Sequence, residues 1–146
     1  MIVIASDHAG VELKAALLEA IRVAGREARD LGPVDTTSVD YPDFAHLVAD
    51  AVASGEAAMG VLICGTGIGM SLSANRHRGV RAALCHDAFT AEMARRHNDA
   101  NVLCVGARVI GGGVAEQVVE VFLSTSFEGG RHQRRVDLIE IEREDS

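Results

Sequence analysis

Residues 60–71 read GVLICGTGIGMS, and this stretch suggests how the rest of the chain is organised. Its first five residues form an apolar run with β-branched side chains, which is typical of a buried parallel strand. A loop in which glycine alternates with other residues follows, and the segment from Ile68 to Asn75 can open a helix. A strand, a glycine-rich turn and a helix N-terminus together present backbone N–H groups to an anion. The stretch therefore predicts an anion-binding loop at the end of a central strand.

Cys64, at the end of this strand, adds a group that can move a proton, and Thr66 adds a hydroxyl donor. A thiol has an ordinary pKa of about 8.5, which falls beside a helix N-terminus. Two other interpretations stay open at this point. A free cysteine often packs as a small core residue. A dinucleotide-binding fingerprint is less consistent, because its third glycine would stand at Met70, whereas the chain has it at Gly69.

The composition sets limits on the class of protein. A chain of 146 residues has the length of one domain, and its 48% of apolar residues suffices for a core. Aromatic residues are only 3%, so the core is expected to be aliphatic. The formal net charge of −7 disfavours general nucleic-acid binding, which needs a basic surface. We therefore expect one domain over residues 1–146 and no nucleic-acid partner.

The cysteines and the apolar segments indicate the compartment. Cys64, Cys85 and Cys104 form no C-x-x-C pair and are odd in number, which predicts neither a zinc site nor a structural disulfide and fits the reducing cytoplasm. Residues 57–75 carry no charge over 19 residues, close to the length of a membrane span. Because this segment holds four glycines and several polar residues, we expect no membrane association.

Strand and helix signals alternate along the chain. Strands are expected at residues 2–5, 26–31, 60–64, 80–85 and 101–105. Helices are expected at residues 11–24, 43–54, 68–75, 87–96, 114–123 and 133–144, the second of them capped by Asp43. This alternation predicts an α/β fold, a Rossmann-like three-layer sandwich with a five-stranded parallel sheet and a C-terminal helix. Ligands bind such sheets at the carboxyl ends of the strands.

Six segments, which cover nearly the whole chain in order, resemble the ribose-5-phosphate isomerase B family, which includes galactose-6-phosphate and allose-6-phosphate isomerases. They are SDHAG at 6–10, DYP at 40–42, CGTGIG at 64–69, RHN at 96–98, GAR at 106–108 and EGGRHQRR at 128–135. The resemblance implies a Rossmann-like homodimer, or a dimer of such dimers, that works without metal or cofactor. It also implies active sites at the dimer interface, with the helix at about 133–144 beside them.

The resemblance implies an aldose–ketose isomerase that acts through an enediolate, with a role for each matching residue. Cys64 would be the base and His97 would help to open the sugar ring. Thr66 and the backbone amides of Gly65, Gly67, Ile68 and Gly69 would stabilise the enediolate. The sugar would be held by Asp7, His8, Tyr41 and Asn98, and the phosphate by Arg108, Arg131 and Arg135, the last two from the partner subunit. Some family members use a glutamate shortly after the loop, but Met70, Ser71 and Leu72 stand there in this chain.

The residue chemistry agrees with these expectations. Isomerisation needs one base that takes and returns a proton, and fixed donors aimed at the developing charge. Arg131 and Arg135 are four residues apart and would share one face of a helix. The expected substrates are ribose 5-phosphate and ribulose 5-phosphate. The alternatives are a tetrose or hexose phosphate (erythrulose phosphate, allose 6-phosphate, galactose 6-phosphate), or a phosphometabolite-binding module without turnover.

Overall fold

The computed structural model describes residues 1–142 and is built on a five-stranded sheet. Its strands are β1 (Ile2–Ser6), β2 (Ala28–Asp30), β3 (Met59–Cys64), β4 (Ala82–Leu84) and β5 (Val102–Gly106), in the order β2-β1-β3-β5-β4. Every neighbouring pair is parallel. The predicted α/β class and parallel sheet are therefore confirmed, as is the edge position of the alternating second strand. β2 and β4 are shorter than predicted, as is common for edge strands.

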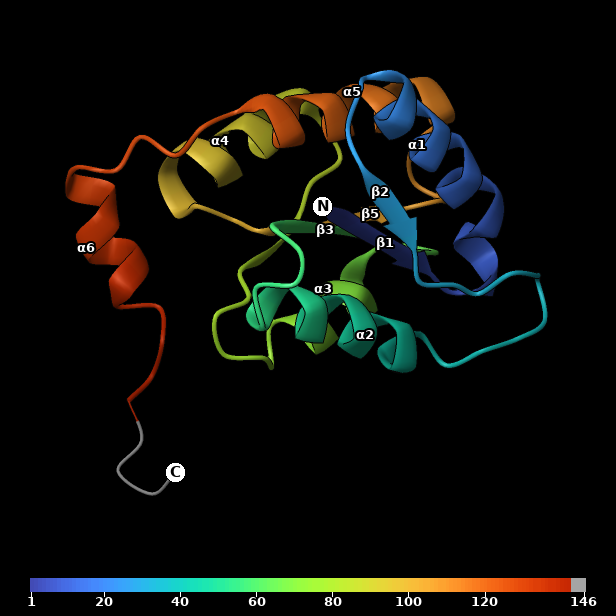
Figure 1. Cartoon of the computed structure of the whole chain (residues 1–146), viewed down its shortest axis with the longest axis horizontal. Helices are drawn as coiled ribbons and strands as arrows, with labels where there is room; N and C mark the ends of the chain where they lie inside the picture. Colours follow the sequence, from blue (N-terminus) through green and yellow to red (C-terminus); the bar gives the residue numbers. More distant parts are fainter. Residues whose placement is uncertain (143–146) are drawn as a thin grey trace.

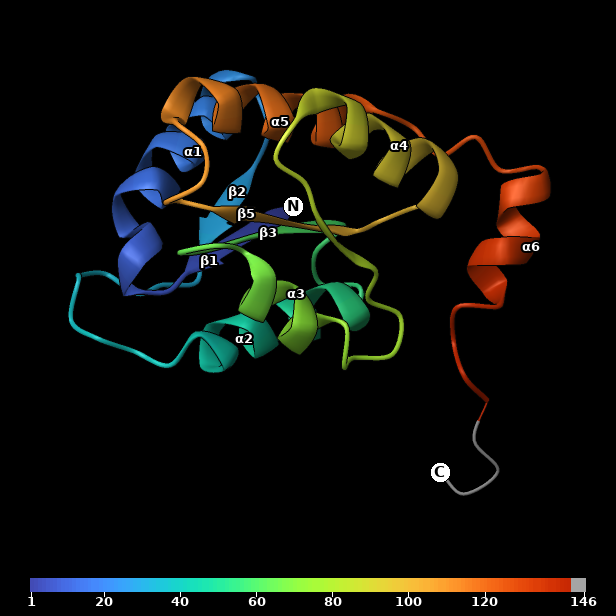
Figure 2. The same ribbon diagram turned by 180° about the vertical axis from the view of Figure 1, so that it is seen from behind.

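Helices cover both faces of this sheet, which gives three layers (Figures 1 and 2). α1 (Val11–Val23), α4 (Ala88–Asn98) and α5 (Gly112–Ser124) lie on one face, and α2 (Tyr41–Ala53) and α3 (Ile68–Ala74) lie on the other. A short 3-10 turn, η1 (His8–Gly10), links β1 to α1. Because successive side chains of a strand point to opposite faces, Ile63 and Val105 pack under the first set of helices and Leu62 and Cys104 under the second.

The start of α2 differs from the prediction. The helix begins at Tyr41, with Asp40 at the N-cap position, so Asp43 lies in the first turn and is not the cap. Pro42 precedes the predicted start of the helix at residue 43, but it stands in the first turn of the observed helix. Proline fits there because a first-turn N–H has no partner within the helix. Asp43 still suits its place, since an acidic side chain in the first turn favours the helix dipole.

Two further helices run longer than predicted. α5 begins at Gly112, with Gly111 as its N-cap, so its glycines form the first turn. α4 continues past residue 96 to Asn98, and Asp99 ends it in the left-handed conformation at φ 45°. This extension has a consequence for the site, because it places His97 and Asn98 within the last turn of the helix.

The C-terminal helix α6 is shorter than predicted and starts earlier. It spans Arg131–Asp137, residues 138–142 are not helical, and residues 143 and 144 of the predicted helix lie outside the described part of the chain. His132 and Val136 are its only buried side chains, whereas Leu138, Ile139 and Ile141 are exposed. A short helix is marginal without packing, which explains why the structure does not continue it. α6 packs against the end of α4 and stands apart from the three layers (Figures 1 and 2).

Candidate active site

The loop after β3 surrounds the thiol of Cys64. This residue is 4% exposed, and its Sγ atom accepts a hydrogen bond from the Gly67 N–H at 3.1 Å. Gly67 has φ +80°, a conformation that side-chain-bearing residues rarely adopt, and the turn it makes brings this amide back to the sulfur. Thr66 Oγ1 accepts a hydrogen bond from the Ile68 N–H at 3.3 Å, at the start of α3. The predicted strand, loop and helix are thus all present.

Two side chains from distant segments lie directly against this loop. A methyl group built on Gly69 would lie 2.6 Å from the ring of Tyr41, and one on Gly65 would lie 3.3 Å from Nη1 of Arg108. The loops after β3 and β5 are joined by a hydrogen bond from the Arg108 N–H to the Gly65 carbonyl at 3.0 Å. The alternating glycines therefore leave room for Tyr41 and Arg108, which sequence reasoning chose for the site without knowing this contact.

Asp7 and His8 complete this end of the sheet. They follow β1, which pairs with β3, and the Asp7 N–H donates to the carbonyl of Ile63 at 3.0 Å. Asp7 Oδ1 accepts the Ala9 N–H at 2.9 Å, and His8 Nδ1 accepts the Val39 N–H at 3.2 Å. We call this set of six residues at the carboxyl ends of the strands the loop group: Asp7, His8, Tyr41, Cys64, Thr66 and Arg108.

His86 is a neighbour of the loop group that the sequence-based site did not include. Its Nε2 atom accepts a hydrogen bond from the Gly106 N–H at 2.9 Å, which braces the turn that carries Arg108. The available signal was its position directly after the predicted strand at residues 80–85, because ligands bind at the carboxyl ends of the strands of a parallel sheet. The other two cysteines, Cys85 and Cys104, are not members of the loop group; both are buried, and burial raises the pKa of each thiol.

His97 and Asn98 lie at the opposite end of the sheet, where the parallel strands begin. They end α4, which leads the chain back to the beginning of β5, where Val102 pairs with Gly60. Cys64 pairs with Gly106, four residues further along both strands, which is about 13 Å at 3.3 Å per residue. Within one chain the structure therefore does not bring His97 and Asn98 to the loop group.

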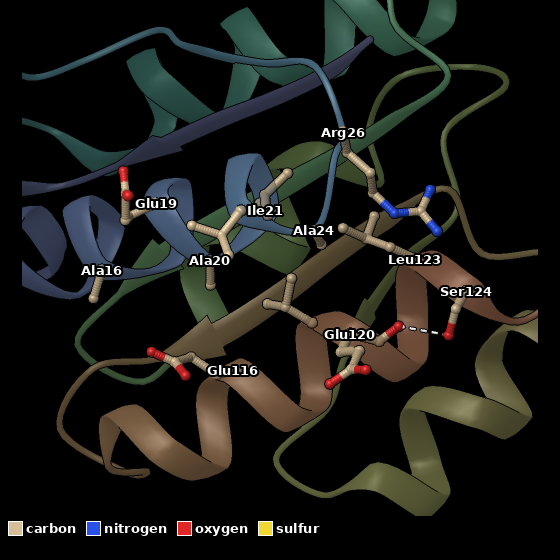
Figure 3. A pocket seen from close by; sticks show the side chains of 12 residues that line it. Ala16, Glu19, Ala20, Ile21, Ala24, Arg26, Glu116, Glu120, Leu123 and Ser124 are labelled. Carbon is tan, nitrogen blue, oxygen red and sulfur yellow. Dashed lines mark hydrogen bonds between the residues drawn. The ribbon is translucent and has the colours of Figure 1, made fainter.

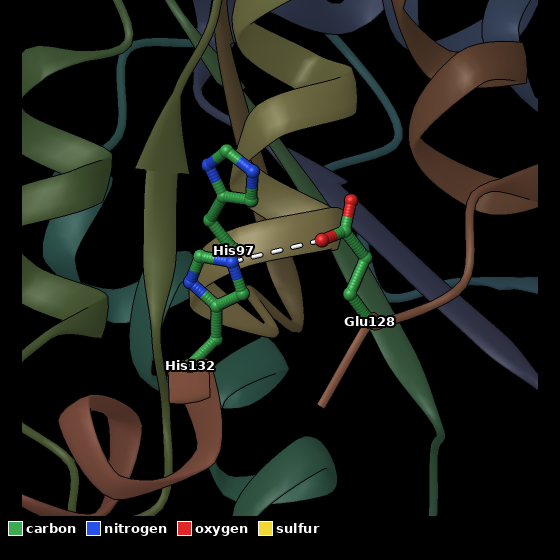
Figure 4. Close-up of side chains that lie close together, drawn as sticks. All are labelled: His97, Glu128 and His132. Carbon is green, nitrogen blue, oxygen red and sulfur yellow. Dashed lines mark ion pairs between the residues drawn. The ribbon is translucent and has the colours of Figure 1, made fainter. Parts of the chain in front are cut away.

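His97 instead meets the C-terminal segment. Its ring stacks on that of His132, with centroids 4.3 Å apart and planes 12° from parallel, and Glu128 Oε2 lies 3.6 Å from His132 Nε2 (Figure 4). Arg131 and Arg135, both exposed, lie on the same helix as His132. We call His97, Glu128 and His132 the histidine group. Sequence reasoning missed Glu128 and His132 as its members, although both lie in the segment 128–135 that carries the family resemblance.

Charge in the histidine group is unevenly distributed. Burial lowers the pKa of His132, the charges of His97 and Arg131 lower it further, and Glu128 opposes them. Among the described residues this is also the one set of three whose ligand atoms, all within 4.8 Å of one another, could hold a metal ion. Two parallel rings do not aim their nitrogen lone pairs at one point, and the nearby Arg96 and Arg131 repel a divalent cation. The donor set therefore fits a metal poorly.

A separate groove of about 530 Å³ lies between α1 and α5 and contains none of the predicted site residues (Figure 3). Alanine and larger aliphatic side chains line it, together with four charged residues, Glu19, Arg26, Glu116 and Glu120. No helix in the described part of the chain is both long and apolar enough to cross a membrane.

Comparison with known proteins gives a consistent result. A family model described as Ribose/Galactose Isomerase matches residues 2–139. The putative sugar phosphate isomerase YwlF of Bacillus subtilis is 50% identical over 139 residues, which cover 94% of this chain and 93% of that protein. A solved ribose-5-phosphate isomerase B of Clostridium thermocellum superposes with a TM-score of 0.93 at 47% identity, covering 94% and 93% of the two chains.

A second solved structure is that of ribose-5-phosphate isomerase B from Mycoplasma genitalium with bound ribulose-5-phosphate. It has a TM-score of 0.91 and 46% identity to this chain, and the match covers 94% of this chain and 92% of that one. Sequence and fold thus agree over nearly the whole length, and the resemblance seen in the six motifs is confirmed. The chain belongs to the ribose/galactose isomerase family.

Proposed function

We propose that this protein is a cytoplasmic sugar-phosphate isomerase that interconverts ribose 5-phosphate and ribulose 5-phosphate. The observation that carries the proposal is the arrangement at Cys64, whose sulfur accepts the Gly67 N–H inside a glycine loop. That amide faces the atom that bears negative charge once the thiol has lost its proton. The family and the names of its members support the reaction class.

The reaction is a proton transfer between two neighbouring carbons. The Cys64 thiolate removes the proton from C2 of the open-chain aldose, the C1–C2 double bond forms, and the C1 oxygen takes up negative charge. The thiol then returns the proton to C1, while the hydroxyl proton on the C2 oxygen moves to the C1 oxygen, which gives the ketose. Thr66 and the amides of residues 65–69 donate to the charged oxygen, and such donors can each contribute about 3 kcal/mol to the transition state.

Ring opening and phosphate binding are assigned to the remaining residues. His97 accepts the proton of the anomeric hydroxyl, the bond from C1 to the ring oxygen breaks, and the same imidazole returns a proton to that oxygen. Asp7, His8, Tyr41 and Asn98 hold the sugar. Arg108, Arg131 and Arg135 bind the phosphate, whose binding energy assists the chemistry from a distance.

These assignments require two chains. In one chain the loop group lies at the carboxyl ends of the strands and the histidine group lies at their amino ends. A site that uses both groups therefore takes the loop group from one subunit and the histidine group from the other. We therefore propose a homodimer in which His97 and Asn98, as well as Arg131 and Arg135, act in the partner's site. Exposed apolar side chains next to the loop group offer a contact surface, among them Ile68, Leu72, Leu84 and Phe89.

The test is proton NMR of pentose, tetrose and hexose phosphates incubated with the purified protein in D2O. Turnover of ribose 5-phosphate, with exchange of the transferred hydrogen for solvent deuterium, is the expected result. The ribulose-5-phosphate bound to the Mycoplasma genitalium relative supports a pentose. Preferred turnover of a hexose or tetrose phosphate would change the substrate and keep the chemistry. Binding without turnover or exchange of any of these compounds would refute the isomerase.

A further inference from the structure

His132 has no part in the mechanism proposed above, yet its side chain is buried and stacked on another ring. It is 8% exposed, it is one of the two buried side chains of α6, and its ring lies nearly parallel to that of His97 at 4.3 Å. A side chain that merely filled space beneath α6 could be aliphatic, as Val136 is one turn later. The aromatic face turned to His97 therefore calls for a chemical explanation.

The stack can carry only one positive charge at low cost. A cation over a neutral aromatic face is attracted to it, whereas two parallel imidazolium rings at this distance repel each other. His132 is the member whose charged form is disfavoured, because burial lowers its pKa and the positive charges of His97, Arg131 and Arg135 add to this effect. Glu128 alone among the groups that face it acts in the opposite direction.

His97 is the member that must become charged, since proton transfer in ring opening passes through its imidazolium. The charged groups around the pair of rings are Arg96 on the helix of His97, Glu128 in the link between α5 and α6, and Arg131 beside His132 on α6. Arg96 Nη1 lies 3.9 Å from Glu128 Oε1 and Glu92 Oε1 lies 2.8 Å from Arg96 Nη2, so much of the nearby charge is already paired. The face of the His132 ring then lies directly against the transient cation, with the two ring centroids 4.3 Å apart.

We propose that His132 is a positioning residue for His97: it is an uncharged aromatic platform that fixes the plane of the His97 ring and stabilises the imidazolium formed there during ring opening. The proposal rests on the assignment of ring opening to His97. It assigns a role to a buried residue that does not itself touch the sugar.

The test compares three substitutions that keep, remove or invert the platform. His132→Phe keeps an uncharged ring, His132→Gln removes the ring, and His132→Lys adds a charge. We expect the NMR titration curve of the His97 ring protons to be retained with Phe, to move to lower pH with Gln and to move further in that direction with Lys. Val136→Ala is the matched control, because it shortens the other buried side chain of α6 and keeps both rings of the stack.

Two kinetic measurements separate ring opening from the later chemistry. Turnover of cyclic ribose 5-phosphate should fall about threefold in His132→Gln and be rescued in His132→Phe. Hydrogen exchange on open-chain ribulose 5-phosphate should stay unchanged in both variants. Val136→Ala should leave the ratio of the two rates as in the wild type. If His132→Gln changes neither the His97 titration curve nor this ratio, or if His132→Phe fails to rescue, the platform is refuted.

The titration also separates this inference from the function on which it rests. If the wild-type protein turns over no sugar phosphate while the His97 titration curve follows the expected order, the proposed function fails and the stacking effect stands. If the wild type is an isomerase but the titration shows no order, the function stands and the role of His132 falls.

Discussion

At the scale of single residues, the loop group depends on glycines that leave space as well as on the side chains that fill it. Gly65 and Gly69 have no Cβ, and Arg108 and Tyr41 occupy the space that a Cβ would need. The thiol of Cys64 is the one titratable atom held inside this loop, by the Gly67 amide. Substitutions at these positions therefore test chemistry and packing separately.

Replacement of Cys64 by alanine is expected to abolish isomerisation and to leave sugar-phosphate binding largely intact, because only the proton carrier is lost. Steady-state turnover and calorimetric titration with ribose 5-phosphate measure the two effects. Cys85→Ala is the matched control, since this buried thiol lies outside the loop group and its pKa is raised by burial. More than a tenth of wild-type kcat in Cys64→Ala would exclude the assigned role.

Replacement of Gly69 by alanine tests the packing of Tyr41. The new methyl group would meet the ring at 2.6 Å, so the free energy of unfolding should fall by about 1–3 kcal/mol, as in other overpacked sites. In a Tyr41→Ala background the same change should cost much less, because the clashing ring is gone. Urea denaturation of the four proteins gives this double-mutant cycle. Equal costs in both backgrounds would mean that the contact does not matter.

At the scale of helices and strands, hydrophobic periodicity was enough to predict where most elements lie, and their ends were harder. The parallel sheet followed from alternating strand and helix signals, as the observed strands confirm. The C-terminal helix was predicted to continue past Asp137, whereas residues 138–142 are not helical, because the sequence does not show that Ile139 and Ile141 stay exposed in the described part of the chain. The contact between Tyr41 and Gly69 was equally hidden, since it joins segments far apart in sequence.

The N-terminus of α4 offers a test of element stability against pH. Asp87 caps this helix, and the backbone hydrogen bond from Thr90 to its carboxylate lowers the pKa of Asp87. A lowered pKa means that the stabilisation is present above the unfolded-state value, near 3.9, and is lost as the pH falls through the lower folded-state value. Asp87→Ala should therefore reduce stability at pH 7 and lose this effect in acid.

Urea denaturation of wild type and Asp87→Ala at pH 7, 5 and 3 measures that difference. Asp87→Asn is the control, because its amide oxygen can still accept the Thr90 N–H while it carries no charge. A stability difference that stays constant down to pH 3 would contradict the assigned origin.

The contact between α4 and α6 brings together the three residues of the histidine group. The side chains in and around this group predict whether the enzyme activity depends on a metal ion. Because Arg96 and Arg131 lie beside the group and the two rings are parallel, we expect EDTA to leave isomerase activity unchanged. Activity assays before and after dialysis against the chelator check this. A loss that added Mn²⁺ or Zn²⁺ restores would show that the prediction of a metal-free enzyme is wrong.

At the scale of the whole molecule, the sheet separates the two groups of candidate residues. Sequence reasoning predicted the six residues of the loop group and, of the histidine group, His97 alone, and it assigned only Arg131 and Arg135 to the partner. The position of His97 could have been deduced from topology, since a helix between two parallel strands returns the chain from the carboxyl end of one strand to the amino end of the next. Because α4 extends to Asn98, both His97 and Asn98 lie at the amino ends of the strands.

Mixed dimers test this division. Cys64→Ala and the double variant Arg131→Ala with Arg135→Ala should each be inactive, and they are unfolded together and refolded. Random pairing makes about half of the dimers mixed, each with one intact site, so about a quarter of wild-type activity should return for a two-fold symmetric dimer. Cys64→Ala paired with His97→Asn should likewise recover turnover of ribose 5-phosphate. Mixtures as inactive as their components would refute the shared site.

The separation of Cys64 and His97 along the strands also affects how amino-acid substitutions accumulate in this chain during evolution. In a shared site, the side chains that must suit one sugar phosphate belong to different polypeptides, although one gene encodes both. A substitution near Cys64 would then be compensated by one near His97, with no contact between them inside the chain. Coevolving positions in the family should accordingly include pairs about 13 Å or more apart in this fold, which an intrachain contact map would discard as noise.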